Sequence, residues 1–168
     1  MMASARLWAV VALLLGAASV AHAETEGARC IVRIIHAIDA GTAGATTDVK
    51  IDSKIDRLRP YLLKPPFTAW REFVLLDRHS VDLEIKVPQK FPLPNGKTAT
   101  LTFVEHLPAT DGKHHRVRMQ LQIDGPHPLD TVFVVHEGGV VLQAGQRFQN
   151  GLLVLATSCD QAHDRAAP

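Results

Sequence analysis

Apolar and polar residues alternate along most of the chain with the period of two that is typical of a half-buried β-strand. The clearest case is Val117 to Ile123, where apolar side chains alternate with arginine and glutamine. Further apolar or alternating segments run from Cys30 to Ile38, Phe73 to Leu76, Val81 to Val87, Lys97 to Glu105, Thr131 to His136, Val140 to Gln143 and Leu152 to Thr157. The pattern predicts about eight short strands.

A single helical segment interrupts this pattern. Ile55, Leu58 and Leu62 have the spacing of one helix face, and Asp52 is placed to cap the segment. Pro60 lies inside the segment and limits its length. With turn sequences such as Asn95-Gly96 between the strands, we expect an all-β protein. The predicted fold is an antiparallel β-sandwich, Ig-like or similar, with one short helix near 52–62.

The first 23 residues have the features of a secretory signal peptide. Arg6 precedes an apolar run from Leu7 to Val20, and Ala21-His22-Ala23 fits a cleavage site. The run is too short to cross a bilayer, and no later apolar run is longer. We therefore expect a signal peptide over 1–23, one domain over 24–160 and a flexible tail over 161–168. The expected location is the periplasm or the extracellular space.

Two cysteines lie near the ends of the predicted domain. Cys30 opens the first predicted strand, and Cys159 follows the last one. In an exported protein such a pair predicts one disulfide, although two buried free thiols are the alternative. A disulfide requires the two Cα atoms within about 7 Å, which favours antiparallel first and last strands.

The charge balance limits the partners of the mature chain. Of 18 basic residues the leader holds one, Arg6, so the remainder equals the 17 acidic residues. A neutral domain is not expected to bind nucleic acid through general charge attraction. The expected partner is a protein or an envelope component, and the sequence does not fix the oligomeric state.

No catalytic motif is present. The serines lack the G-x-S-x-G context and the cysteines lack the C-x-x-C spacing, so we expect neither a catalytic residue nor a cofactor. Histidine is abundant, with nine in the chain. His106, His114 and His115 flank one predicted hairpin loop and are the candidate metal ligands. The alternative is that they are solvated loop residues.

Two features are candidates for a binding surface. Lys113, Arg116 and Arg118 form a local basic cluster that suits an acidic partner, or that simply solvates a hairpin. Trp70 is the only tryptophan after the leader. An exposed tryptophan would favour binding, whereas a buried one would anchor the core.

Four short motifs resemble those of small exported all-β proteins of Gram-negative bacteria whose functions are unassigned. The motifs are Pro65-Pro66-Phe67, Phe73-Val74-Leu75-Leu76, Leu93-Pro94-Asn95-Gly96-Lys97 and Gly151-Leu152-Leu153-Val154-Leu155. The resemblance implies a β fold and a bacterial envelope setting. It implies no functional residue.

Three functions remain open at this point. The first is an exported, non-enzymatic binding or structural module of the bacterial envelope, stabilised by one disulfide. The second is a metal-binding protein or metal-dependent enzyme that uses the histidines. The third is a secreted enzyme inhibitor, with the segment from Leu107 to Lys113 as its inhibitory loop.

Overall fold

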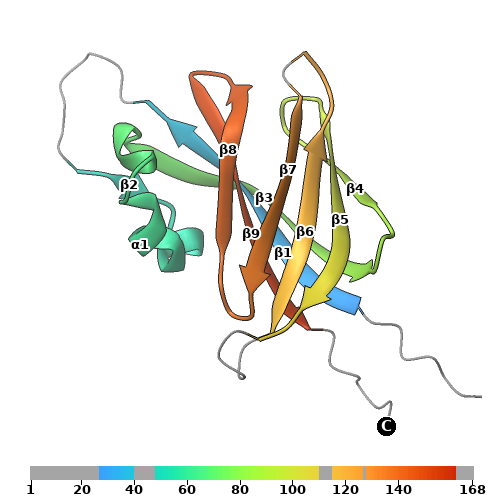
Figure 1. Cartoon of the computed structure of the whole chain (residues 1–168). Coiled ribbons are helices and arrows are strands. Elements are labelled where there is room, and N and C mark those ends of the chain that lie inside the picture. Colours follow the sequence, from blue (N-terminus) through green and yellow to red (C-terminus); the bar gives the residue numbers. More distant parts are fainter. Residues whose placement is uncertain (1–26, 40–47, 110–114, 127, 162–168) are drawn as a thin grey trace, which may run out of the picture.

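The computed structural model describes residues 27–39, 48–109, 115–126 and 128–161, which fold into two β-sheets packed face to face (Figure 1). A five-stranded sheet has the order β2-β3-β1-β9-β8, and a four-stranded sheet has the order β4-β5-β6-β7. The strands are β1 (Gly27–Ile38), β2 (Lys50–Ile51), β3 (Glu72–Glu84), β4 (Gln89–Pro92), β5 (Thr98–Leu107), β6 (Arg116–Ile123), β7 (Leu129–His136), β8 (Val141–Phe148) and β9 (Gly151–Gln161). The all-β sandwich prediction is confirmed, with nine strands in the described residues instead of about eight.

The first and last described strands are direct neighbours. β1 and β9 pair antiparallel, and Cys30 lies opposite Cys159 in their register. The two cysteines form a disulfide with their Cα atoms 4.0 Å apart. The predicted disulfide and the predicted antiparallel arrangement are therefore both confirmed. The predicted signal peptide lies outside the described residues, as does the predicted tail apart from Gln161, which ends β9.

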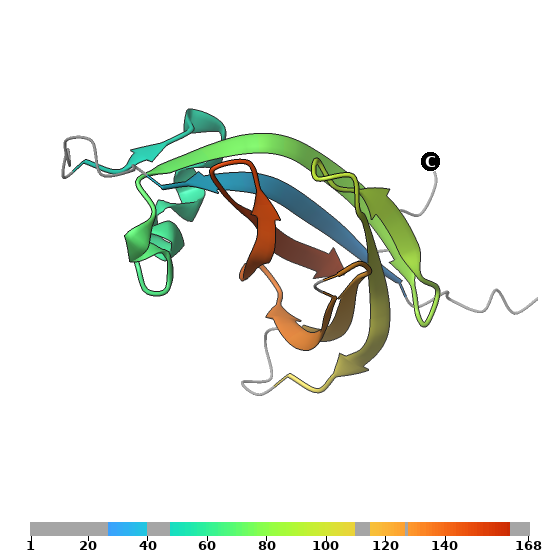
Figure 2. The same ribbon diagram turned by 90° about the horizontal axis from the view of Figure 1, so that it is seen from above.

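The main core lies between the two sheets, which curve around it (Figure 2). β6 shows why the sequence alternates: Val117, Met119, Leu121 and Ile123 are buried, whereas the polar residues between them are partly exposed. β4 is an edge strand of this sheet, in keeping with Pro92 at its end. No helix in the described parts of the chain is long and apolar enough to cross a membrane.

A helical segment covers part of the outer face of the five-stranded sheet (Figures 1 and 2). It consists of η1 (Ser53–Leu58), α1 (Arg59–Leu62) and η2 (Phe67–Ala69). Ile55, Leu58 and Leu62 are buried in a second core, as their spacing predicted. Residues of β1, β3 and β9 complete this core from the sheet. β1 is therefore covered on both faces, which explains its almost continuous apolar sequence.

β3 is one long strand, whereas the sequence pattern predicted two strands separated near Asp77-Arg78. The strand continues because it pairs with β1 along its whole length. Its register shifts near the middle, where Leu75 lies opposite Ile35 but Asp77 lies opposite Ile34. Leu76 is thus an extra residue, a β-bulge. The bulge brings Leu75 and Arg78 to the same face of the sheet, although residues three apart in a regular strand face opposite sides.

Candidate functional site

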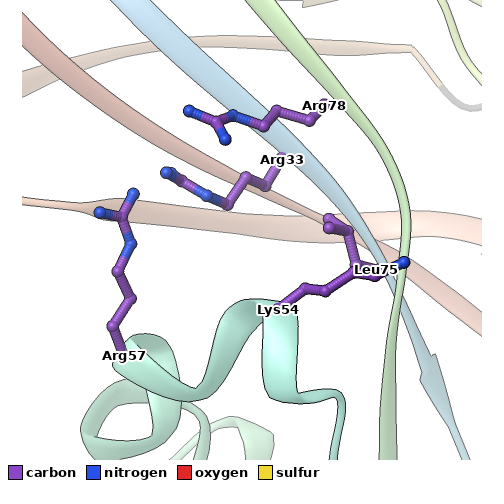
Figure 3. Close-up of a pocket in the computed structure, with 5 residues that line it drawn as sticks. All are labelled: Arg33, Lys54, Arg57, Leu75 and Arg78. Atoms are coloured by element: carbon purple, nitrogen blue, oxygen red, sulfur yellow. The ribbon is translucent and has the colours of Figure 1, made fainter.

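A cavity of about 460 Å³ opens where the helical segment meets the outer face of the five-stranded sheet. Four of the side chains that line it are basic (Figure 3). The lining residues are Arg33, Lys54, Arg57, Leu75 and Arg78. The volume lies in the range of small-molecule sites and far exceeds the roughly 30 Å³ that one water molecule occupies.

Three structural elements bring the basic side chains together. Arg33 lies in β1, directly opposite Arg78 of β3, and Arg57 extends from η1. On the other side of Arg33 the register residue of β9 is Ala156, whose small side chain leaves space. The guanidinium groups of Arg33, Arg57 and Arg78 gather on one side of the cavity (Figure 3). The Lys54 side chain runs the other way past Leu75, so its ammonium group is not part of this set.

Arg33 is the unusual member of this group because it is buried. Only 3% of its surface is exposed, and its Nη1 donates a hydrogen bond to Ser158 Oγ at 3.3 Å. Within the described ranges, no carboxylate forms an ion pair with Arg33, Arg57 or Arg78. A buried charge without a counter-charge is costly, and like charges opposite each other across strands repel. The cavity therefore carries a buried positive charge that no carboxylate of the described chain neutralises in an ion pair.

The next charged pair along the same two strands consists of opposite charges, unlike Arg33 and Arg78. Arg29 of β1 lies opposite Asp82 of β3, and Arg29 Nε donates to Asp82 Oδ1 at 2.6 Å. This hydrogen bond lowers the pKa of Asp82 below its ordinary value. β1 and β3 thus carry a neutral pair at one position and two positive charges four residues further along β1.

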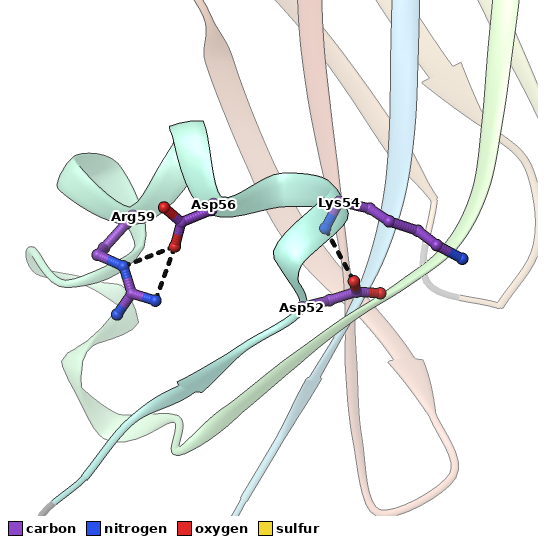
Figure 4. A network of polar contacts seen from close by, with 4 residues as sticks. All are labelled: Asp52, Lys54, Asp56 and Arg59. Atoms are coloured by element: carbon purple, nitrogen blue, oxygen red, sulfur yellow. Dashed lines mark hydrogen bonds and ion pairs between the residues drawn. The ribbon is translucent and has the colours of Figure 1, made fainter.

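The acidic residues of the helical segment are engaged elsewhere (Figure 4). Asp52 accepts hydrogen bonds from the backbone N–H of Lys54 at 2.9 Å and of Leu75 at 3.3 Å. Asp56 forms an ion pair with Arg59, with Nη2 and Oδ1 2.7 Å apart. These contacts cap η1 and fix it to β3. They hold Arg57 in place beside the cavity without neutralising it.

The predicted metal ligands do not form a complete site in the part of the chain that can be described. His114 lies outside the described residues. The ring of His106 packs edge-on against Phe103 at 4.7 Å between centroids, and its Nδ1 is buried without a protein hydrogen-bond partner. Over the described ranges, no three His, Cys, Asp or Glu side chains are grouped to hold a metal ion. The trio of His106, His114 and His115 remains a prediction.

The predicted basic surface has partners within the chain. Arg116 donates from Nε and Nη2 to the carbonyl oxygen of Pro108, at 3.0 and 2.7 Å. Arg118 forms an ion pair with Glu105. Lys113 lies outside the described residues. Trp70 is half-buried and packs against the second core. It therefore anchors the helical segment to the sheet.

The three arginines of the cavity were not among the site residues predicted from the sequence. Arg33 carries a signal that points to it: it interrupts an apolar strand that is buried on both faces, where a charged residue is rare. Arg57 and Arg78 carry no such signal, because isolated exposed arginines are common on protein surfaces. Only the three-dimensional structure brings them to Arg33.

Comparison of the chain with protein-family models, curated proteins and solved structures found no match in any of the three.

Proposed function

We propose that this protein is an exported, non-enzymatic binding module whose site is the arginine cavity, and that the cavity takes the anionic group of a small ligand. The observation that carries the proposal is the buried guanidinium of Arg33, which lies opposite Arg78 without a carboxylate partner in the described chain. An anion placed between these groups would remove their mutual repulsion and satisfy their free donors. The Cys30–Cys159 disulfide supports an oxidising, exported setting.

The chemistry of the cavity favours binding over catalysis. Guanidinium groups stay protonated at neutral pH, so they hold a charge without exchanging a proton. Their planar donor forks match the oxygen atoms of phosphate, sulfate and carboxylate groups. Ser158 is held by the hydrogen bond from Arg33. Arginine groups of this kind hold an anion in place but supply neither a nucleophile nor a base.

Isothermal titration calorimetry with inorganic phosphate and with sulfate, in a chloride buffer of constant ionic strength, tests the proposal. We expect one saturable site with a dissociation constant of about 1 mM or below, equivalent to roughly 4 kcal/mol. Arg33→Met and Arg78→Gln should each weaken binding at least tenfold. Lys90→Gln is the matched control, because Lys90 is an exposed cation on the other sheet. Equal binding by all four proteins, or no binding by any, would refute the proposal.

A further inference from the structure

A second cavity, of about 230 Å³, adjoins the arginine cavity. Arg57 lines both cavities. Ser158 lines the second one and accepts the hydrogen bond of Arg33, which lines the first. The two cavities therefore share Arg57 and lie on either side of the Arg33–Ser158 contact, along the outer face of β1 and β9. A ligand that is held by the arginines and is long enough to pass this contact would reach the second cavity.

The second cavity has a different chemistry from the first. Its apolar surface comes from β1, the helical segment and the turn before β8, and includes Ile31 and Val140. Tyr61, a residue that is 43% exposed, adds an aromatic side chain. Asp160 supplies an exposed carboxylate. It lies opposite Arg29 in the β1–β9 register, but the Arg29 guanidinium donates its hydrogen bond to Asp82 on the other side. The carboxylate and the serine hydroxyl can accept hydrogen bonds from hydroxyl groups on the ring of a ligand. The aromatic side chain offers a face against which such a ring can pack.

The spacing of these groups limits the size of the ligand. Ser158 and Asp160 are two residues apart on β9 and face the same side, so their Cα atoms are about 7 Å apart. Ser158 itself is in contact with Arg33. Ser158 therefore lies between the positive end of the combined site at Arg33 and its negative end at Asp160. A ligand with anionic groups at both ends would be repelled at Asp160.

We infer that the ligand is a monosaccharide with a single phosphate group, with its phosphate on the arginines and its hydroxyl groups facing Asp160 and Ser158. This inference rests on the proposed function and adds the part of the ligand that lies beyond the anion. The phosphate accepts hydrogen bonds from Arg33, Arg57 and Arg78. The sugar ring lies against Tyr61, whose exposed ring provides an apolar face for it.

Calorimetric titration with glucose 6-phosphate, inorganic phosphate and glucose tests the inference on the wild-type protein and on Asp160→Ala, Tyr61→Ala and Asp124→Ala. We expect wild type to bind glucose 6-phosphate at least tenfold more tightly than inorganic phosphate. In Asp160→Ala, removal of a nearby negative charge should tighten phosphate binding while glucose 6-phosphate binds at least fivefold more weakly. A misfolded variant would lose both ligands, so opposite changes are specific to the inference.

Tyr61→Ala should reduce the preference for glucose 6-phosphate over phosphate at least threefold. Asp124→Ala should change neither ligand, because Asp124 is an exposed carboxylate at the end of β6 on the other sheet. If phosphate binds through Arg33 but glucose 6-phosphate binds no more tightly, the inference is wrong and the proposed function stands. If neither anion binds, both are wrong.

Discussion

Replacing Arg33 by methionine should stabilise the ligand-free protein, although substitutions at buried positions usually destabilise. Methionine keeps an unbranched side chain of similar length and removes the charge. Arg33 is almost fully buried, faces Arg78 across the strand pair and has no carboxylate partner in the described chain. The substitution therefore removes a repulsion and a desolvation cost together.

The magnitude follows from the geometry of the strand pair. At a separation of about 7 Å, two unit charges repel by about 0.6 kcal/mol in water and about 2.4 kcal/mol at an effective dielectric constant of 20. Arg78 is exposed, so a value of about 1 kcal/mol is appropriate. Loss of the hydrogen bond to Ser158 costs about 1 kcal/mol. Relief of the buried charge contributes about 1–4 kcal/mol. The repulsion and hydrogen-bond terms cancel, so the net expectation is about 1–4 kcal/mol of added stability.

Urea unfolding in a low-salt chloride buffer, followed by circular dichroism, measures this difference. Arg118→Met is the matched control, because Arg118 is also a strand arginine but has an ion pair with Glu105. The control should lose up to about 1 kcal/mol. Phosphate at a hundredfold excess over its wild-type dissociation constant should stabilise wild type by about 2.7 kcal/mol and Arg33→Met, which binds at least tenfold more weakly, by about 1.4 kcal/mol at most. If Arg33→Met loses more than about 1 kcal/mol in chloride, the charge is structural and the argument for an anionic ligand fails.

Three further predictions concern the rest of the fold. Reduction of the Cys30–Cys159 disulfide, whose sequence separation is 129, should lower the free energy of unfolding by about 5 kcal/mol, because it frees a long loop in the unfolded chain. Urea titrations with and without dithiothreitol measure this change. A change below about 1 kcal/mol would contradict the loop-entropy model. Hydrogen bonds from two glutamine side chains of β6 hold the pKa of Asp130 below its ordinary value of 3.8. The ionised carboxylate therefore contributes its full stabilisation above pH 3.8, and this stabilisation is lost as the pH falls through the lowered pKa of the folded protein. Carboxyl NMR titration should show the low midpoint, and replacing both glutamines by alanine should raise it. Gly151→Ala should destabilise by about 3 kcal/mol in thermal or urea unfolding, because the new Cβ would lie 2.0 Å from the carbonyl oxygen of Ala37; a loss below about 0.5 kcal/mol would mean that the strands separate easily there.

Local chemistry made much of the fold predictable. The alternation in β6 reflects a strand with one face in the core, and the spacing of Ile55, Leu58 and Leu62 reflects a helical segment with one buried face. The disulfide geometry then favoured antiparallel first and last strands, as observed in β1 and β9. These features depend on residues that are near each other in the sequence or are joined covalently.

The arginine cavity was not predictable in the same way, because it depends on register. Arg78 faces Arg33 on the side of Leu75 only because the bulge at Leu76 shifts the alternation of β3 by one residue. Nothing in a sequence of apolar residues followed by Asp77 and Arg78 specifies where such a bulge lies. Arg57 reaches the cavity through the packing of the helical segment, which is a tertiary contact.

The pairing of β1 with β9 also has a consequence for how the chain folds. These strands stand at opposite ends of the described chain, so the centre of the five-stranded sheet is formed by contacts of very high sequence separation. Folding limited by such contacts takes milliseconds to seconds, and the docking of β9 would be its late step. Until then β1 has an apolar edge that can pair with another chain. A chain that stops before Gly151 should therefore aggregate, even though eight of the nine described strands are complete.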